Sequence, residues 1–584
     1  MSARGPSDAR GNPSGSRSAD ARGHAEQALW RMMSSYDDPL AEFDAAMSAD
    51  PGWALPHVMK AGFLLGRAEP ALLHEVAAHL SHARALAAGA PARARAHLDA
   101  VQQAAEGRWH AASRTWDDLL VEHPRDALAL HWAQQCDLLR GDAAALRSRP
   151  ARALPEWDDA DPLHPHLLGL YAFGLEECNL HAQAEEAGRR ALAADARVPW
   201  AVHAVAHVME MQGRFEEGSA WLRQHQAQWA EGTLLAGHLW WHKALFRLEA
   251  LDVAGVMRIV DAHLDGAALR GTLQRVDATA LLWRLHLLGE DVAGQAAALL
   301  HDWDLPAEHA GHHAFFDVHA VMAMLAAGRA GCAERHVARC AERALAPQDA
   351  RRANHQTARE VGLPLMRGLL AFARGQHAAA CELIHPVRAL APRLGGSHVQ
   401  RDVVDLTLLA CAARGGPAAL GRALLNERVM AKPVTPLTRR WVEALGGGVA
   451  ARAGGGRPVS DPPPDPQRER EQRLKLLEDD IGRHLAESAK SGELARAPSF
   501  GKPLDFGDGY DETPAELRMA MKVLKDAGVV PAEVEAMQRI AALQAELDAL
   551  APDAPAAGPL RRRIADLRIA LALRLEGLRR SGQL

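Results

Sequence analysis

The sequence predicts an all-α protein built mainly from repeated pairs of helices. Leu and Ala are abundant throughout the 584 residues and β-branched residues are sparse, a composition that favours helix over strand. No stretch of alternating Val, Ile and Thr indicates a sheet. Turn residues also recur at a regular spacing, so we expect the helices to be short and paired.

The overall composition excludes several classes of protein. A net charge of −6 gives no broad basic surface for nucleic acid. The six cysteines are scattered without a CxxC pair, so neither a disulfide framework nor a cysteine zinc site is expected, and a reducing cytoplasm is the expected location. No apolar run reaches the roughly 18 residues of a membrane span.

Composition also divides the chain into four parts. Residues 1–24 are rich in Gly, Ser, Arg and Pro and are expected to be a disordered tail. Residues 25–445 are continuously helix-like, with short breaks. Residues 446–467 are rich in Gly and Pro and are typical of a flexible linker. Residues 468–584 form a charged helical module.

A repeat is visible in the large helical part. Gly107 and Gly141 are 34 residues apart, and so are Asn179 and Gly213, which is the tetratricopeptide period. Gly107 and Asn179 each close the first helix of a repeat. A small residue in the following helix, such as Ala112, then lets the neighbouring helix pack closely. Because stacked pairs bury the apolar face that one pair leaves uncovered, we expect a right-handed tetratricopeptide-like α-solenoid with a concave inner face.

The same part of the chain resembles a named family. Residues 25–445 are similar to the tetratricopeptide repeat protein 38 family through seven collinear blocks, which include "YAFGLEECNLHAQAEEAGRRAL", "WAVHAVAHVMEMQGRFEEG", "HLWWHKALFRLE" and "LLNERVMAKPVTPLT". The resemblance implies the architecture and does not imply a reaction.

A stripe of polar residues follows from the tetratricopeptide register. Trp200, His203, His207 and Glu210 occupy positions that line the concave groove in that family, where water or a ligand reaches them. Adjacent repeats place further polar and aromatic side chains at groove positions, with His242 beside them. The candidate ligand-binding residues are Trp200, His203, His207, Glu210, Glu176, Glu177, His238 and Trp241. His131, Gln135, His166 and Phe173 take similar positions in other repeats.

Three interpretations of this stripe remain open. The side chains can hydrogen-bond between helices and stabilise the superhelix, or they can grip a peptide or a small anionic ligand. They can also hold a divalent metal ion between His203, His207, His238 and Glu176, since two histidines four residues apart share one helical face. The "HAVAH" stretch lacks the internal Glu of the HExxH zinc-protease helix, so no catalytic residue is assigned.

Two other polar segments are interpreted as structural. Asp317 and His319 are two residues apart, so their side chains diverge on a helix and are expected to serve packing and capping. Gly395 and Gly396 precede a helix start and are expected to form a turn between helices.

The C-terminal module resembles a second family. The segments "GKPLDF", "ELRMAMKVLKDAG" and "VPAEVE" are similar, in order and motif, to the conserved domain of DnaJ homologue subfamily C member 28, over roughly residues 475–545. The J-domain tripeptide His-Pro-Asp is missing, so chaperone recruitment through that motif is not implied. The last helices are expected to pair as a hairpin or coiled coil, a possible route to self-association.

These observations lead to one functional hypothesis and one alternative. The hypothesis is a non-catalytic cytoplasmic scaffold without a cofactor, which binds a protein, peptide or small ligand in its groove and carries a C-terminal interaction module. The alternative is a metal-dependent, hydrolase-like enzyme that uses the histidines and carboxylates of the groove.

Overall fold

The computed structural model describes residues 6–265, 269, 271–303 and 310–445, together with residues 540, 543–547, 560, 563 and 564. Helices and no β-strands occur in these residues, which confirms the all-α prediction. The chain separates into two compact units, residues 1–456 and 457–584, and the boundary falls within the stretch expected to be a linker. Among the described helices, none has the length and apolar character needed to cross a bilayer.

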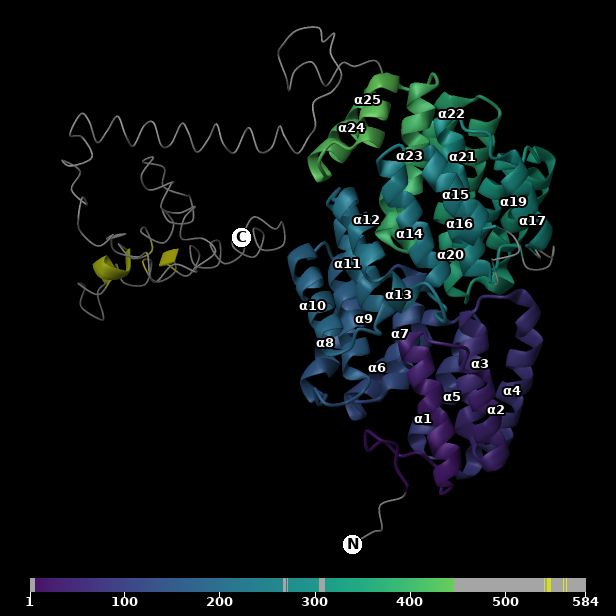
Figure 1. The fold of residues 1–584 in the computed structure, drawn as a ribbon, viewed down its shortest axis with the longest axis vertical. Helices are drawn as coiled ribbons and strands as arrows, with labels where there is room; N and C mark the ends of the chain where they lie inside the picture. The colour runs from purple at the N-terminus through teal and green to yellow at the C-terminus, as the bar shows by residue number, and fades with distance from the viewer. Residues whose placement is uncertain are drawn as a thin grey trace. The chain divides into compact units, whose positions relative to one another are not determined.

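Short helices follow one another through the first half of unit 1 (Figure 1). They are α1 (Ala19–Ser34), α2 (Leu40–Ala49), α3 (Ala54–Gly66), α4 (Leu73–Leu86), α5 (Ala92–Ala105), α6 (Trp109–Glu122), α7 (Ala127–Arg140), α8 (Ala143–Ala153), α9 (His164–Glu177), α10 (His181–Ala194), α11 (Pro199–Met211), α12 (Phe215–Gln224) and α13 (Gln226–Trp229).

The second half continues in the same way, with a short π-helical turn before α21. Its helices are α14 (Ala236–Glu249), α15 (Val253–His263), α16 (Thr272–Leu288), α17 (Ala293–Asp302), α18 (Ala314–Ala326), α19 (Ala330–Leu345), α20 (Ala353–Thr357), α21 (Leu363–Ala373), α22 (His377–Ile384), α23 (His398–Ala413), α24 (Ala418–Ala431) and α25 (Pro436–Ala444).

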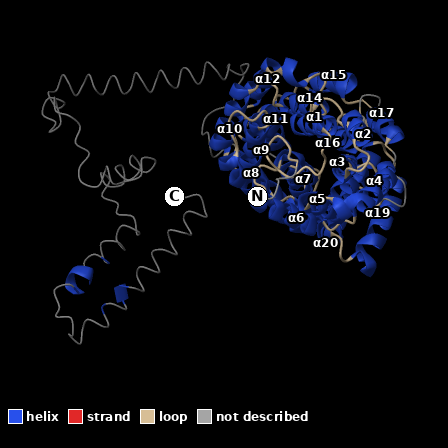
Figure 2. Ribbon diagram, turned by 90° about the horizontal axis from the view of Figure 1, so that it is seen from below, coloured by secondary structure: helices blue, strands red, loops and turns tan. Residues whose placement is uncertain are grey.

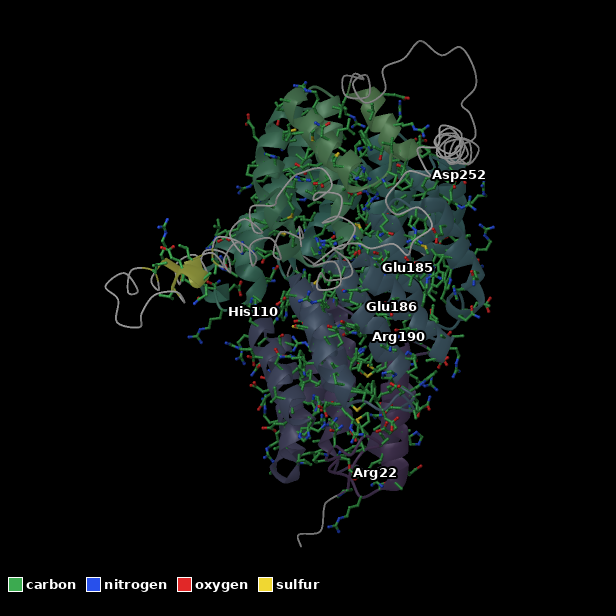
Figure 3. All side chains as sticks on the ribbon, turned by 90° about the vertical axis from the view of Figure 1, so that its left-hand side faces the viewer. Arg22, His110, Glu185, Glu186, Arg190 and Asp252 are labelled. Carbon is green, nitrogen blue, oxygen red and sulfur yellow. The ribbon has the colours of Figure 1, made fainter. Side chains whose placement is uncertain are left out.

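The helices of unit 1 pack as stacked pairs. Helix α9 packs against α8 and α10 and also against α11, the first helix of the next pair. Figure 2 shows α9, α11, α14 and α16 on the inner side of the curved stack, with α10, α12, α15 and α17 outside them. On outer helix α10, the exposed side chains of Glu186 and Arg190 lie on the face turned to the viewer in Figure 3. This arrangement is compatible with an α-solenoid.

Left-handed backbone turns close the inner helices at the residues expected to do so. Gly141 (φ +66°) ends α7 and Gly213 (φ +68°) follows α11, while Asn179 adopts the same conformation (φ +60°) after α9. Glycine adopts this conformation without steric cost, and Asn is among the few other residues that tolerate it. The small residue Ala112 is fully buried in α6, as expected of a residue that admits a neighbouring helix.

The stack curves until distant parts of the chain meet. The Ala353 amide donates to the Gly107 carbonyl at 2.8 Å, and the Gly396 amide donates to the Leu138 carbonyl at 3.0 Å. Helix α23 packs against both α11 and α16, which belong to much earlier repeats. The inner face of these helices is therefore covered by later parts of the same chain.

The N-terminal segment is also packed, so the expectation of a disordered tail is wrong for residues 6–24. Helix α1 already begins at Ala19. Before it, the side chains of Ser14 and Ser16 are buried, and the Trp53 indole donates to the Ser14 carbonyl at 2.7 Å. Small polar residues let this extended segment lie close to the helices, where the body of the unit satisfies its backbone groups.

Candidate functional site: a buried histidine and carboxylate centre

The candidate site is built from four successive inner helices. Helix α11 carries His203 and His207, and α14 carries His238 and His242. Each pair is four residues apart and therefore lies on one face of its helix. Carboxylates come from α9 on one side and from α16 on the other. The sequence thus places imidazoles at the centre and acids on both flanks.

The imidazole nitrogens of the four histidines converge. His203 Nε2 lies 2.9 Å from His238 Nε2, and His242 Nε2 lies 3.2 Å from the same atom. The His207 ring lies beside both the His203 ring (centroids 4.3 Å apart) and the His242 ring (4.6 Å). One nitrogen from each of the four residues lies within 4.8 Å of the others.

Carboxylates stand behind three of the four rings. His238 Nδ1 donates to Asp277 Oδ2 at 2.7 Å. His207 Nδ1 is 3.2 Å from Glu176 Oε2, and His242 Nδ1 is 3.6 Å from Glu210 Oε2. Among these three contacts, that of His238 is a hydrogen bond, and the other two are close approaches without hydrogen-bond geometry. All three involve Nδ1 and leave Nε2 on the other side of the ring. The amide of Gln400, from α23, holds the second oxygen of Asp277 at 2.9 Å.

Burial favours the neutral form of three histidines and two carboxyl groups of this centre. It lowers the pKa of His203 and His242 well below the ordinary value and that of His207 to about 3, because a charged ring loses its hydration there. For the same reason it raises the pKa of Glu210 to about 8 and that of Glu176 well above its usual range.

Several polar atoms of the centre lack a hydrogen-bond partner among the described residues. They are His203 Nδ1, both ring nitrogens of His207, His242 Nδ1, both carboxyl oxygens of Glu176 and Glu210 Oε2. A buried polar group without a partner costs about 1–3 kcal/mol. A bound ion or water is one arrangement that would satisfy such a group of atoms.

The predicted groove residues come together, but they are not accessible as expected. His203, His207, Glu176 and Trp241 are buried, and Glu177 is buried against Arg401 of α23 at 3.1 Å. The expectation that water or a ligand reaches these side chains is wrong, because the curvature of the stack brings α23 onto them. Burial of His203, His207 and Glu176 is tolerable in their neutral forms, and Glu177 is paired with Arg401.

The remaining groove residues vary in exposure. The His238 side chain is 17% exposed, which leaves it the most open of the four histidines. Trp200 is half-buried and donates from Nε1 to Ser35 Oγ at 3.2 Å, while Trp241 stacks on the His238 ring. His131, His166 and Phe173 are buried and Gln135 is half-buried.

Sequence reasoning placed His242 beside the groove without counting it as a site residue, and it missed Asp277. A usable signal was present, because the His238/His242 pair repeats the His203/His207 pair after 35 residues, close to one repeat period. Residues one period apart on inner helices lie side by side in a solenoid. No comparable signal marks Asp277, since a single acid on an amphipathic helix is common.

The two weaker segments have structural partners. Asp317 Oδ1 accepts from His336 at 2.9 Å and from the Gly311 amide at 3.0 Å, while His319 donates to the Phe315 carbonyl. Their side chains therefore take different partners, as the two-residue spacing indicates. Gly395 and Gly396 lie in a turn before α23, whose first residues form a capping box with Ser397.

Comparison with known proteins concerns the C-terminal part of the chain. Residues 481–548 match the family described as DnaJ homologue, subfamily C, member 28, conserved domain. The chain is 34% identical over 96 residues to the uncharacterized protein YhdN of Escherichia coli (strain K12). The aligned stretch is 16% of this chain and 78% of YhdN. The chain belongs to this conserved-domain family. The resemblance expected for roughly residues 475–545 is confirmed.

The detailed expectations for the conserved domain lie outside the described residues. They concern most of the charged helical module at residues 468–584 and the pairing of its last helices as a hairpin or coiled coil. In unit 2 the structure describes short helical pieces, among them residues 543–547.

Proposed function

We propose that unit 1 is a tetratricopeptide-like, metal-binding helical-repeat domain. A divalent transition-metal ion, zinc in the first place, is held by His203, His207, His238 and His242. The observation that carries this proposal is the convergence of four imidazole nitrogens with carboxylates behind three of them.

The distances within the centre support a tetrahedral site. Zinc–nitrogen bonds of about 2.0–2.1 Å place the ligand nitrogens of a tetrahedron about 3.3–3.4 Å apart. The nitrogen pairs around His238 Nε2, at 2.9 and 3.2 Å, are close to this value. A metal-binding histidine almost always gives its second nitrogen to a carboxylate, a carbonyl or water, as His238 does to Asp277.

The proposal assigns the ion a structural role. Four protein nitrogens complete a tetrahedral shell, whereas catalytic zinc sites have three protein ligands and a water. The ion ties α11 to α14, two consecutive inner helices. Stabilising the curvature of a repeat domain in this way fits the resemblance of residues 25–445 to the tetratricopeptide repeat protein 38 family.

Metal analysis of the full-length protein tests the proposal. We expect about one equivalent of zinc per chain after purification without chelator, and its loss in both His203→Ala and His207→Ala. His74→Ala, which changes an exposed histidine of α4, should retain the metal. Restoring zinc to chelator-treated wild type should raise its melting temperature, and restoring it to the two variants should not.

Two results would contradict the proposal. The first is that wild-type protein neither contains zinc nor binds added zinc, manganese or nickel. The short contacts between the rings would then be N–H···N hydrogen bonds. Retention of full metal content by both α11 variants would place the ion elsewhere.

A second candidate function is recognition of a peptide in a neighbouring cleft. A cleft of about 690 Å³ is lined by Glu210 and Met211 and by basic and acidic side chains of α23, of α24 and of residues 385–394, which precede α23. Because the lining carries both positive and negative side chains, it suits a peptide with both basic and acidic residues. A photo-crosslinking residue at position 389 should capture a partner protein. The same residue at position 121, an exposed position of α6, should not capture it. Identical products at both positions would reject this function.

The scaffold role in the cytoplasm and the interaction role of the C-terminal domain remain part of this proposal. Fusion of the repeat domain to the conserved domain supports the scaffold and interaction roles, since it joins two compact units in one chain.

A further inference from the structure

A second internal site lies where early repeats meet later ones, away from the histidine centre. It is a cavity of about 140 Å³ between α3, α5, α6 and α7 on one side and the start of α18 on the other. Closure of the helical stack creates it, because the two sides are about 200 residues apart in the sequence. An engineered cavity of similar volume, about 150 Å³, binds benzene.

Aromatic side chains form the walls of the cavity. Trp109, Trp116 and Trp132 contribute indole rings and Phe316 a phenyl ring. Trp109 stacks on His313, with centroids 4.9 Å apart. Glycine makes room for them, since a Cβ at Gly62 would lie 2.3 Å from the Trp132 ring. These walls suit a flat or slender apolar group.

The cavity adjoins a wider opening of about 550 Å³ with a basic rim. The two share Leu73 and His312 in their walls. Three arginines line the opening: Arg84, Arg343 and Arg352.

The charge of this rim is only partly balanced. Arg343 and Arg352 share one carboxylate, Asp349, at 3.7 and 3.0 Å. Arg84 donates to the neutral amide of Gln102 at 3.0 Å. Glu106 also lines the opening but pairs with Arg108 at 2.6 Å. The rim therefore keeps a positive balance that favours an anion.

From the apolar cavity and its basic rim together, we propose that this site binds a small amphipathic carboxylic acid. Its aromatic ring or short hydrocarbon chain occupies the cavity, and its carboxylate lies at Arg343 and Arg352. Arginine is suited to this task because its planar guanidinium can bind a carboxylate through two hydrogen bonds.

Calorimetry and tryptophan fluorescence test the proposal on the full chain. The probes are 3-phenylpropanoate and its neutral counterpart 3-phenylpropan-1-ol. We expect saturable binding of the acid with a Kd on the order of 0.1–1 mM, and about tenfold weaker binding of the alcohol. The acid should change the emission of the indoles that line the cavity.

Variants at the two ends of the site separate its parts. Leu73→Trp, at the boundary of cavity and opening, should remove binding of both probes. The double change Arg343→Gln and Arg352→Gln should weaken binding of the acid about tenfold and leave binding of the alcohol unchanged. Val121→Trp, on an exposed position of α6, is the matched control and should bind like wild type.

Three results would overturn the inference. They are a failure of wild type to bind the acid, undiminished binding by Leu73→Trp, and an equal loss of both probes in the arginine variant. If Leu73→Trp does not fold, the difference between the two probes in the arginine variant decides the question. Binding of zinc to the histidine centre has no part in this test.

Discussion

At the scale of single residues, Asp277 illustrates how a carboxylate held at both oxygens can orient a histidine ring. One oxygen accepts from His238 Nδ1 and the other from Gln400, so the carboxylate is fixed from both sides. This arrangement directs His238 Nε2 toward the other three rings.

If zinc binds at the centre, Asp277→Asn should lower its affinity by about 10–100-fold. The reason is that an amide holds the imidazole less firmly and reduces the basicity of Nε2. Competition with a chromophoric chelator measures the affinity. Asp44→Asn changes an exposed carboxylate that pairs with Lys60 at 2.8 Å, so it should match wild type. Equal affinities of wild type and Asp277→Asn would reject the role of Asp277.

The buried ring of His131 leads to a prediction about how stability depends on pH. Burial lowers its pKa to about 4, and the Gln135 amide donates to its Nε2, a contact that only the neutral ring can accept. The ordinary value in an unfolded chain is about 6.5. Between pH 6.5 and 4 the unfolded state therefore binds a proton that the folded state does not, so the free energy of unfolding falls as the pH falls.

For this single group the loss between pH 7.5 and pH 5 is about 2 kcal/mol. His131→Gln removes the titrating ring. The free energy of unfolding of this variant should therefore fall by about 2 kcal/mol less than that of wild type between the two pH values. Denaturant titrations at the two pH values, with chelator present, measure the difference. An unchanged pH dependence in the variant would mean that His131 does not remain neutral in the folded state.

At the scale of an element, the turn after each inner helix depends on its surroundings as well as on its backbone. Gly141 and Gly375 both adopt positive φ, at +66° and +73°. A Cβ at Gly141 would lie 1.7 Å from the Pro392 carbonyl oxygen, whereas around a Cβ at Gly375 no described atom beyond its chain neighbours lies within 4 Å. The two positions therefore separate backbone strain from packing.

Gly375→Ala should lower the free energy of unfolding by about 1–2 kcal/mol, the cost of a left-handed alanine. Gly141→Ala should cost more, by about a further 2 kcal/mol, because backbone on both sides has to move. Guanidinium unfolding of the two variants gives the comparison. Equal losses would show that the chain segment around Pro392 yields easily and does not fix the turn.

Repeats of this kind are readable in the sequence because helix length and turn type are local properties. The 34-residue spacing of Gly107 and Gly141 and that of Asn179 and Gly213 correspond to real helix ends. The packing of Gly141 against Pro392 could not be read in this way, because the two residues are about 250 positions apart.

At the scale of the whole molecule, buried ion pairs join the early and late repeats. Arg401 of α23 meets Glu177 of α9 at 3.1 Å, and both side chains are buried. Lys432 and Arg428 meet Glu249 of α14 at 2.9 and 3.3 Å. These pairs hold the later helices against the inner face that carries the histidine centre.

Arg401→Ala should lower the free energy of unfolding by about 3 kcal/mol, because it removes the guanidinium and leaves the buried Glu177 carboxylate with the His398 amide at 2.8 Å. It should also speed amide hydrogen exchange in α11 and α23 while α4 exchanges as in wild type, since the contact between α11 and α23 is loosened. Exchange that is unchanged in α11 would show that α23 stays in place without this ion pair.

The sequence by itself determined the helical class, the ends of the inner helices, the pairing of His203 with His207 on one face, and the C-terminal family. All four depend on local periodicity or on a contiguous motif. A pattern repeated every four or every 34 residues needs no knowledge of distant contacts.

Only the tertiary structure decided that the histidine stripe is buried, that His242 and Asp277 join it, and that an aromatic cavity lies between early and late repeats. The curvature of a solenoid is the sum of small rotations between neighbouring repeats. Each rotation depends on side-chain packing between two helices, and their sum brings α23 onto α11. No local pattern in the sequence encodes that sum.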